Sequence, residues 1–119
     1  MDINQVPRIS CEELKGLIDR GEKVIVIDTR DSVSYEAEHI IGAVNINYDP
    51  SGNSMERDIM LSGLPTDSLL VPYCDCEGDT TSAVMCLDLL NLNFDADKVK
   101  ALQDGIPRWR ELAYPTEKS

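Results

Sequence analysis

The chain has 119 residues, of which 42% are hydrophobic and 28% are charged, as is usual for one globular domain. Asp and Glu outnumber Lys and Arg by 22 to 11, and the net charge of -11 argues against nucleic acid or anionic membranes as partners. No apolar stretch approaches the roughly 20 residues of a membrane helix, and the amino-terminal residues do not resemble a secretory signal. We therefore expect a single domain over residues 1–119, with its core at about residues 8–114, located in the cytoplasm.

The first elements predicted along the chain are a helix and a buried strand. Ser10 and Glu13 have the spacing of a capping box at a helix start, and Gly21 is suited to end that helix. The apolar run Val24–Ile27 is typical of a strand that is buried on both faces, as in a parallel sheet.

Helix and strand signals continue to alternate along the rest of the chain. They predict a short helix near 32–36, a strand over 43–46, a helix over 55–61, a strand over 69–73, a helix from 81, a short strand over 99–102 and a helix from 105. This alternation predicts an open, mostly parallel α/β sheet, in which sites form at the carboxyl ends of strands. Pro72 lacks a ladder donor and is unusual in a central strand, so we expect strand pairing to end at this residue.

Cys74 lies where the predicted strand over 69–73 ends. The polar loop 75–80 follows, and a helix signal begins at Thr81. Loop N–H groups and a helix N-terminus both favour a thiolate, which is a nucleophile, whereas a small half-buried cysteine without chemistry is the alternative at such a turn. Asp28-Thr29-Arg30 ends another strand, so a parallel sheet would bring it to the same edge as Cys74.

Four ordered motifs resemble those of the rhodanese family of sulfurtransferases, over nearly the whole chain. The motifs are Asp28-Thr29-Arg30 after an apolar strand, the segment from Tyr35 to Ile46, Tyr73-Cys74 with the loop that follows, and the segment from Leu102 to Trp109. Departures from the family pattern are Glu38 and Asp104, which replace glycines, and Ile41, which replaces a proline. The resemblance implies a three-layer fold, with a central, mostly parallel five-stranded sheet and helices on both faces.

The resemblance also assigns roles to residues of the expected site. Cys74 would be the catalytic nucleophile, which accepts a sulfane sulfur and becomes a persulfide. The substrate-binding loop would comprise Asp75, Cys76, Glu77, Gly78, Asp79 and Thr80, whose backbone N–H groups would stabilise the anionic sulfur. Supporting residues would be Asp28, Arg30 and Thr81, the first two mainly structural, although Arg30 could help to bind an anion; His39 would also be structural. No metal or organic cofactor is expected.

The loop is acidic where family members active on thiosulfate carry arginines. Asp75, Glu77 and Asp79 would each disfavour the thiolate and repel the thiosulfate anion, at a screened cost on the order of 1 kcal/mol. Thiosulfate is therefore expected to be a poor donor. Thr80 stands where related phosphatases require an arginine, which argues against phosphatase activity.

Cys76 leaves three roles open. It could resolve a Cys74 persulfide by forming a disulfide, it could contribute to half of a zinc site, or it could be an incidental thiol. The other cysteines, Cys11 and Cys86, fall on predicted helices and are expected to pack inertly. Four cysteines are too few and too scattered for a disulfide framework, so reduced thiols are expected.

The leading hypothesis is a rhodanese-like sulfurtransferase or persulfide carrier. Its partners would be a small sulfur donor, such as a neutral polysulfide, or a protein persulfide. One alternative is a weakly catalytic module for protein binding or regulation, whose acidic loop contacts a basic partner. The other is a dithiol redox protein that uses Cys74 and Cys76.

Overall fold

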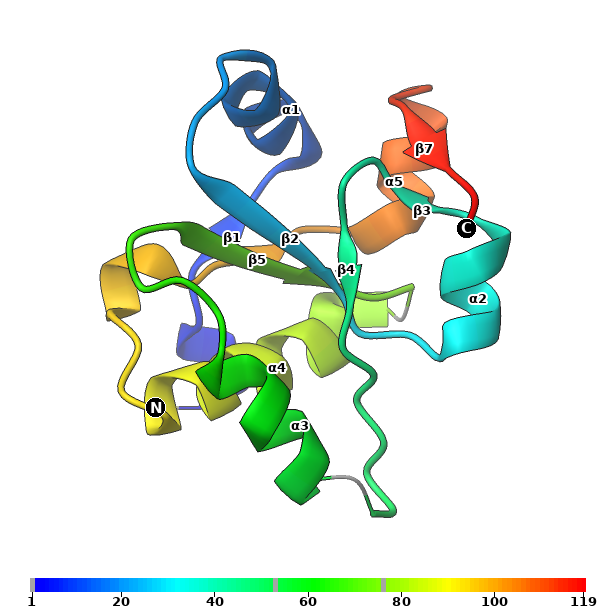
Figure 1. Cartoon of the computed structure of the whole chain (residues 1–119). Coiled ribbons are helices and arrows are strands. Elements are labelled where there is room, and N and C mark those ends of the chain that lie inside the picture. Colours follow the sequence, from blue (N-terminus) through cyan, green and yellow to red (C-terminus); the bar gives the residue numbers. More distant parts are fainter. Residues whose placement is uncertain (1, 53, 76) are drawn as a thin grey trace.

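A parallel sheet runs through the centre of the computed structural model, which describes residues 2–52, 54–75 and 77–119 (Figure 1). One part of the sheet pairs three strands in the order β4-β2-β5, and another pairs β1 with β6; a single bridge between Leu70 and Val99 joins the two parts. The strands are β1 (Arg8–Ile9), β2 (Val24–Asp28), β4 (Val44–Asn45), β5 (Leu69–Tyr73) and β6 (Ala101–Leu102). All of these pairings are parallel, which confirms the predicted fold class.

Pro72 lies inside β5 and does not end its pairing. The ladder with β2 continues to the Asp28–Tyr73 pair, so the expectation that pairing stops at the proline is wrong. Alternate residues of a parallel strand turn their backbone groups to opposite neighbours: Tyr73 bonds on the β2 side, whereas the Leu70 carbonyl accepts the N–H of Lys100 on the β6 side. The backbone groups of Pro72 point to the same side of β5 as those of Leu70. The N–H that proline lacks would therefore face β6, where the only pairing with β5 among the described residues is the bridge between Leu70 and Val99.

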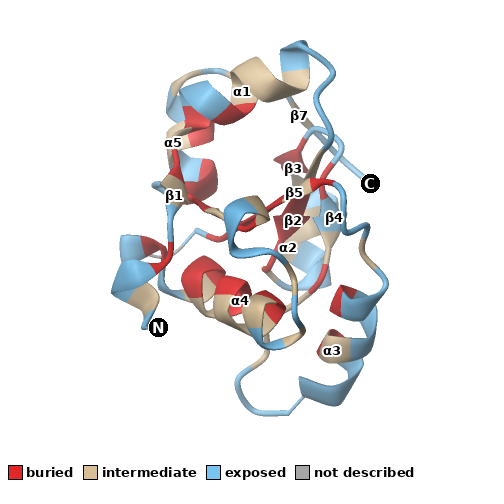
Figure 2. Cartoon of the chain, turned by 90° about the vertical axis from the view of Figure 1, so that its left-hand side faces the viewer, coloured by how far each residue is buried: buried red, intermediate tan, exposed pale blue. Residues whose placement is uncertain are grey.

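Helices cover both faces of the sheet (Figure 2). On one face, α1 (Cys11–Asp19) and α5 (Gly105–Glu111) pack on Val26 and Val71. On the other face, α3 (Ser54–Ser62) and α4 (Thr80–Asn91) pack on Ile27 and Leu70. Neighbouring residues of β2 and β5 thus point into opposite clusters, as expected for strands that are buried on both faces.

The smaller elements complete the layers. They are the short helix α2 (Ser32–Ala37), the antiparallel pair β3 (His39–Ile40) and β7 (Thr116–Glu117), and the 3-10 turns η1 (Ile3–Gln5), η2 (Glu77–Asp79) and η3 (Ala96–Lys98). The capping box predicted for α1 is confirmed: the Ser10 hydroxyl accepts the N–H of Glu13 at 3.0 Å, and the Glu13 carboxylate accepts the N–H of Ser10. Gly21 follows the helix at φ +69°, as predicted for its end.

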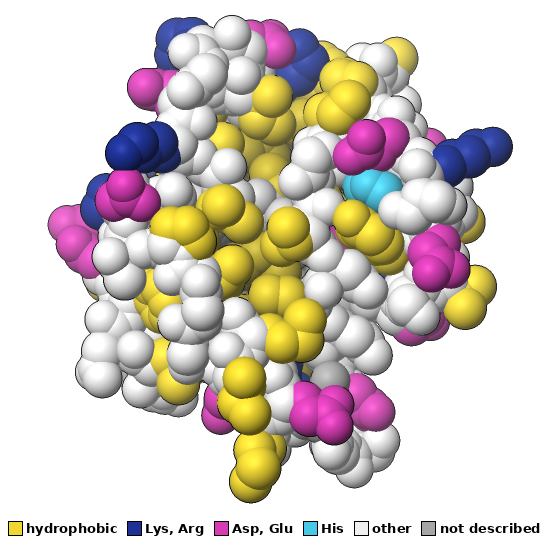
Figure 3. All heavy atoms as spheres, in the orientation of Figure 1, with side chains coloured by type: hydrophobic (Ala, Val, Ile, Leu, Met, Phe, Trp, Pro, Cys, Tyr) yellow, Lys and Arg dark blue, Asp and Glu magenta, His cyan; other side chains and the backbone are white. Residues whose placement is uncertain are grey.

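Part of the surface is apolar despite the acidic composition. Met55, Ile59 and Met60 on α3 are exposed, and Figure 3 shows hydrophobic side chains protruding at the lower edge, over the position of this helix. Among the residues that the structure describes, no helix combines the length and the apolar character needed to cross a membrane.

Candidate active site

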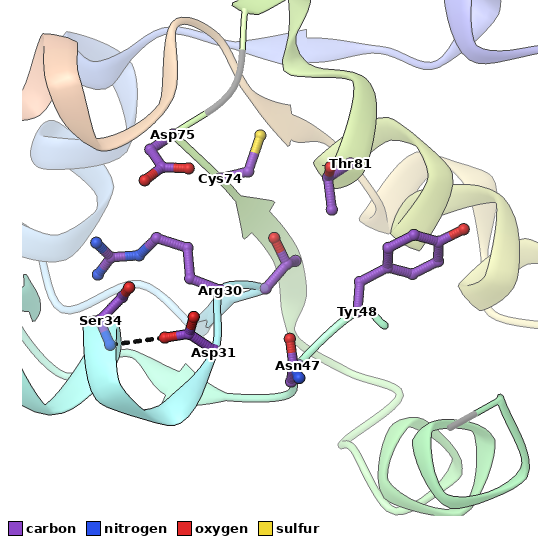
Figure 4. Close-up of a pocket in the computed structure, with 9 residues that line it drawn as sticks. Arg30, Asp31, Ser34, Asn47, Tyr48, Cys74, Asp75 and Thr81 are labelled. Carbon is purple, nitrogen blue, oxygen red and sulfur yellow. Dashed lines mark hydrogen bonds between the residues drawn. The ribbon is translucent and has the colours of Figure 1, made fainter. Parts of the chain in front are cut away.

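A pocket of about 300 Å³ opens where the carboxyl ends of β2 and β5 meet the start of α4 (Figure 4). Its lining residues are Thr29, Arg30, Asp31, Ser34, Asn47, Tyr48, Cys74, Asp75 and Thr81. The structure thus brings Cys74 to the same edge as the residues that follow β2, as the parallel topology requires. Asn47 and Tyr48 come from the segment after β4, the neighbouring strand.

Cys74 follows the last residue of β5 and is almost completely buried. Its Sγ lies 3.9 Å from the hydroxyl of Ser82 in the first turns of α4, and that hydroxyl donates to the carbonyl of Asp79 at 3.0 Å. The Cys74 carbonyl accepts the N–H of Ile106 at 3.1 Å. The cysteine is therefore held through its backbone by the start of α5, with its sulfur directed to the start of α4.

Gly105, the first residue of α5, lies against the backbone of Cys74. It has φ +57°, and a Cβ on it would overlap the carbonyl oxygen of Cys74. Its place in the fourth motif is visible in the sequence, but the contact with Cys74 is visible only in the fold.

Within the pocket lining, Arg30 is paired with a buried carboxylate. Asp28 is fully buried, and its two oxygens accept from the Arg30 guanidinium at 3.0 and 2.7 Å. The hydroxyl of Tyr73 donates to the same carboxylate at 2.7 Å. Burial by itself lowers the pKa of Arg30, but the hydrogen bond and charge of Asp28 outweigh it, so the pKa is raised and the guanidinium stays charged. Its charge is already matched by Asp28.

The loop residues predicted to bind substrate occupy different positions. Asp75 is exposed and lines the pocket, as does Thr81, whereas Gly78, Asp79 and Thr80 do not line it. For Glu77 the structure describes the backbone only, within η2. Cys76, the predicted resolving thiol, lies outside the described residues.

Asp79 is turned into the protein. It is 5% exposed, with its Oδ2 3.7 Å from the Arg8 guanidinium, and its Oδ1 has no hydrogen-bond partner within the part of the chain that the structure describes. Burial raises the pKa of the Asp79 carboxyl above its usual value, and the N–H of Asp104 and the charge of Arg8 offset this only in part. The residue starts α4 at φ 57° without a side-chain cap.

Replacing Asp79 with asparagine is expected to stabilise the protein by about 1 kcal/mol at pH 7. A carboxyl whose pKa is raised by folding carries no penalty below its unfolded pKa of 3.8, and the protein loses stability as pH rises through the folded pKa. Asparagine avoids that penalty and tolerates a left-handed backbone. Urea unfolding at pH 7 and at pH 4 measures the gain, which should shrink at the lower pH. The exposed Asp75→Asn control should change stability by less than about 0.5 kcal/mol. A loss of stability for Asp79→Asn at both pH values would show that the Arg8 pair dominates.

His39 lies away from the pocket lining. Its ring stacks on Tyr35 with centroids 3.9 Å apart; Nδ1 lies 2.7 Å from the Tyr35 carbonyl and Nε2 lies 3.1 Å from the Glu117 carboxylate. Through these contacts His39 connects β3 with α2 and β7, as expected for a histidine with a structural role.

Sequence reasoning missed three groups at this site: Asp31 and its neighbour Ser34, the pair Asn47 and Tyr48, and the positioning residues Ser82 and Gly105. Asp31 is exposed, and the N–H of Ser34 donates to its carboxylate at 2.8 Å, which lowers the pKa of that carboxyl. The strand-end rule could have found the second group, because both residues follow a predicted strand. Within the described residues, no group of three or more His, Cys, Asp and Glu side chains is placed to hold a metal ion.

Comparison with known proteins assigns most of the chain to one family. Residues 10–112 match the family described as "Rhodanese-like domain". The HTH-type transcriptional regulator Rv0324 of Mycobacterium tuberculosis is 34% identical over 110 residues, which are 92% of this chain and 44% of the relative. Adenylyltransferase and sulfurtransferase UBA4 of Debaryomyces hansenii is 30% identical over 106 residues, which are 86% of this chain and 23% of the relative. The chain therefore spans less than half the length of either relative.

Solved structures share the same architecture. A rhodanese-like domain from Anabaena sp. superposes with a TM-score of 0.76 at 25% identity, covering 95% of this chain and 80% of that one. Thiosulfate sulfurtransferase from Pseudomonas aeruginosa superposes with a TM-score of 0.77 at 21% identity, covering 97% of this chain and 21% of that one. These similarities show the fold.

Proposed function

The chain belongs to the rhodanese-like domain family, and on that premise we propose that it is a sulfurtransferase that carries sulfane sulfur as a persulfide on Cys74. The observation that carries the proposal is the position of this thiol, at the end of β5 in a polar pocket and next to the first turns of α4. Helix N-termini and loop N–H groups favour anionic sulfur. A cytoplasmic location would keep the thiol reduced.

The proposed reaction has two displacements. The Cys74 thiolate attacks the outer sulfur of a donor, R–S–SH; the bond between the two donor sulfurs breaks, and RS⁻ leaves with the electron pair. The product is a persulfide of Cys74. An acceptor nucleophile attacks the outer sulfur of that persulfide, and the Cys74 thiolate leaves. No net oxidation occurs, so neither step needs a cofactor.

The two other described cysteines are poorly suited to this role. Burial raises the pKa of Cys11 to about 12, with the charge of Glu12 adding to the effect, and burial likewise raises the pKa of Cys86 to about 12. Both thiols stay protonated at neutral pH, so neither supplies a thiolate nucleophile.

Intact-mass analysis after incubation with inorganic polysulfide and, separately, with thiosulfate tests the proposal. Wild type is expected to gain one sulfur, Cys74→Ser is expected to gain none, and the buried-thiol control Cys86→Ala is expected to behave as wild type. Thiosulfate is expected to load more slowly than polysulfide. Absence of sulfur gain from both donors in folded wild type would reject sulfur transfer from them.

A regulatory or binding module is the second candidate. The 34% identical relative is named as a transcriptional regulator, and Asp75 places an exposed carboxylate beside Cys74 for contact with a basic partner. The dithiol redox alternative depends on Cys76. Cys76→Ser separates it, because a persulfide carrier would keep loading sulfur in this variant, whereas a dithiol couple would lose its disulfide.

A further inference from the structure

The charges around the pocket are unbalanced. Of the lining residues that the structure describes, Arg30 is the cation, and Asp31 and Asp75 are the anions. The Arg30 guanidinium is already paired with the carboxylate of Asp28, whose side chain is fully buried. Neither of the two lining carboxylates has an ion pair within 4.0 Å among the described residues, and both side chains belong to exposed residues.

Two features keep the negative charge in place. The N–H of Ser34 donates to Asp31, and this hydrogen bond lowers the pKa of a carboxyl that is already ionised at neutral pH; the charge of Arg30 acts in the same direction. Asp75 is the residue next to Cys74, and its exposed side chain lines the same pocket. The other described groups of the lining are neutral hydroxyls and one amide, from Thr29, Ser34, Asn47, Tyr48 and Thr81. A bound anion would meet two carboxylates and a guanidinium whose charge is already paired with Asp28.

We infer that the donor for this site is a persulfide whose carbon skeleton carries a cationic group close to the sulfur, and that Asp31 and Asp75 are specificity-determining residues. The inference rests on the proposed function. The cation is an ammonium or guanidinium group, either of a small amine persulfide or of a protein cysteine persulfide flanked by Lys or Arg. Attack by Cys74 releases the donor as a thiolate, so the cation also offsets the negative charge that develops on the leaving sulfur.

The test compares donors that differ mainly in charge. Hydropersulfides of cysteamine, 2-mercaptoethanol and 3-mercaptopropionate, generated from their disulfides and hydrosulfide, supply a cation, a neutral group and an anion. The initial rate of sulfur gain on Cys74 is followed by intact mass. The donors differ in intrinsic reactivity, so rates are compared as a ratio: the rate with the cationic donor divided by the rate with the anionic donor. The informative quantity is this ratio in wild type divided by the same ratio in the double variant Asp31→Asn/Asp75→Asn.

We expect this quotient to be about tenfold at low salt and to fall as salt is added. Asparagine can keep the cap that Asp31 forms on α2, so the double variant should remain folded. The matched control is Glu36→Gln/Glu56→Gln, which removes the same net charge from exposed residues outside the pocket lining, and its ratio should equal that of wild type.

A second arm separates the two sources. Peptides with a persulfidated cysteine flanked by lysine or by glutamate are compared with the small donors. A lysine peptide that outpaces cysteamine persulfide supports a protein carrier; loading by cysteamine persulfide but not by the peptide supports a small donor. An unchanged ratio in the double variant, with Cys74 still loaded, would overturn the inference and leave the proposed function standing. Failure of every donor, polysulfide included, would overturn both.

Discussion

Replacing Gly105 with alanine is expected to lower the free energy of unfolding by about 2–4 kcal/mol and to displace Cys74. The residue has φ +57°, and an added Cβ would overlap the carbonyl oxygen of Cys74, a backbone atom that cannot rotate away. The same carbonyl accepts the N–H of Ile106, so moving it also breaks that hydrogen bond. Urea unfolding measures the stability, and the rate of thiol alkylation at Cys74 reports its accessibility.

Gly21 provides the matched control for Gly105. Its φ is +69°, and a Cβ on it would meet nothing within 4 Å. Gly21→Ala therefore carries the backbone cost without the collision, about 1 kcal/mol, and should leave Cys74 alkylation unchanged. Equal losses for the two variants, with equal alkylation rates, would refute a steric role of Gly105 at the site.

Local patterns predicted the fold because each rested on interactions between near neighbours in the chain. The capping box at Ser10, the helix end at Gly21 and the buried run of β2 all need only a few consecutive residues, and the structure contains each of them. The strand-end rule then placed Cys74 at the same edge of the sheet as Asp28-Thr29-Arg30. Pairing at Pro72 was mispredicted because the effect of a missing N–H depends on which neighbouring strand that position of β5 faces within the sheet.

The site itself depends on contacts between distant segments, which local patterns do not contain. The sequence predicts Asp79 to be an exposed acid of the loop. In the structure its backbone is left-handed and its carboxylate points inward, toward Arg8. Asp31 caps the N-terminus of α2, which is a local contact. Its position in the pocket lining follows only from the fold. Of the loop acids expected at the site, Asp75 lines the pocket and Asp79 does not, whereas Asp31 comes from outside the loop.

Replacing Asp28 with asparagine is expected to lower the free energy of unfolding by about 3–5 kcal/mol. Asp28 is fully buried and accepts hydrogen bonds from the guanidinium of Arg30 and the hydroxyl of Tyr73. Its removal leaves the Arg30 guanidinium, whose side chain is 8% exposed, without the buried carboxylate that pairs with it. The variant should also lose sulfur loading at Cys74, because Tyr73 is the residue before it and β5 pairs with β2 at this position. Urea unfolding and intact-mass loading measure the two effects.

Two comparisons separate the buried charge from other causes. Asp67→Asn removes the partner of Lys23 in an exposed ion pair of 2.8 Å, and should cost less than about 1 kcal/mol. Asp28→Asn/Arg30→Met removes both charges and should recover part of the stability lost in Asp28→Asn, because most of that loss comes from burying an unpaired guanidinium rather than from the broken hydrogen bonds. If the double variant were instead less stable than Asp28→Asn by the full cost of Arg30→Met alone, the two side chains would be energetically independent. The floor of the pocket would then depend on Tyr73 and on the strand ladder, and Arg30 would be able to serve as an anion site.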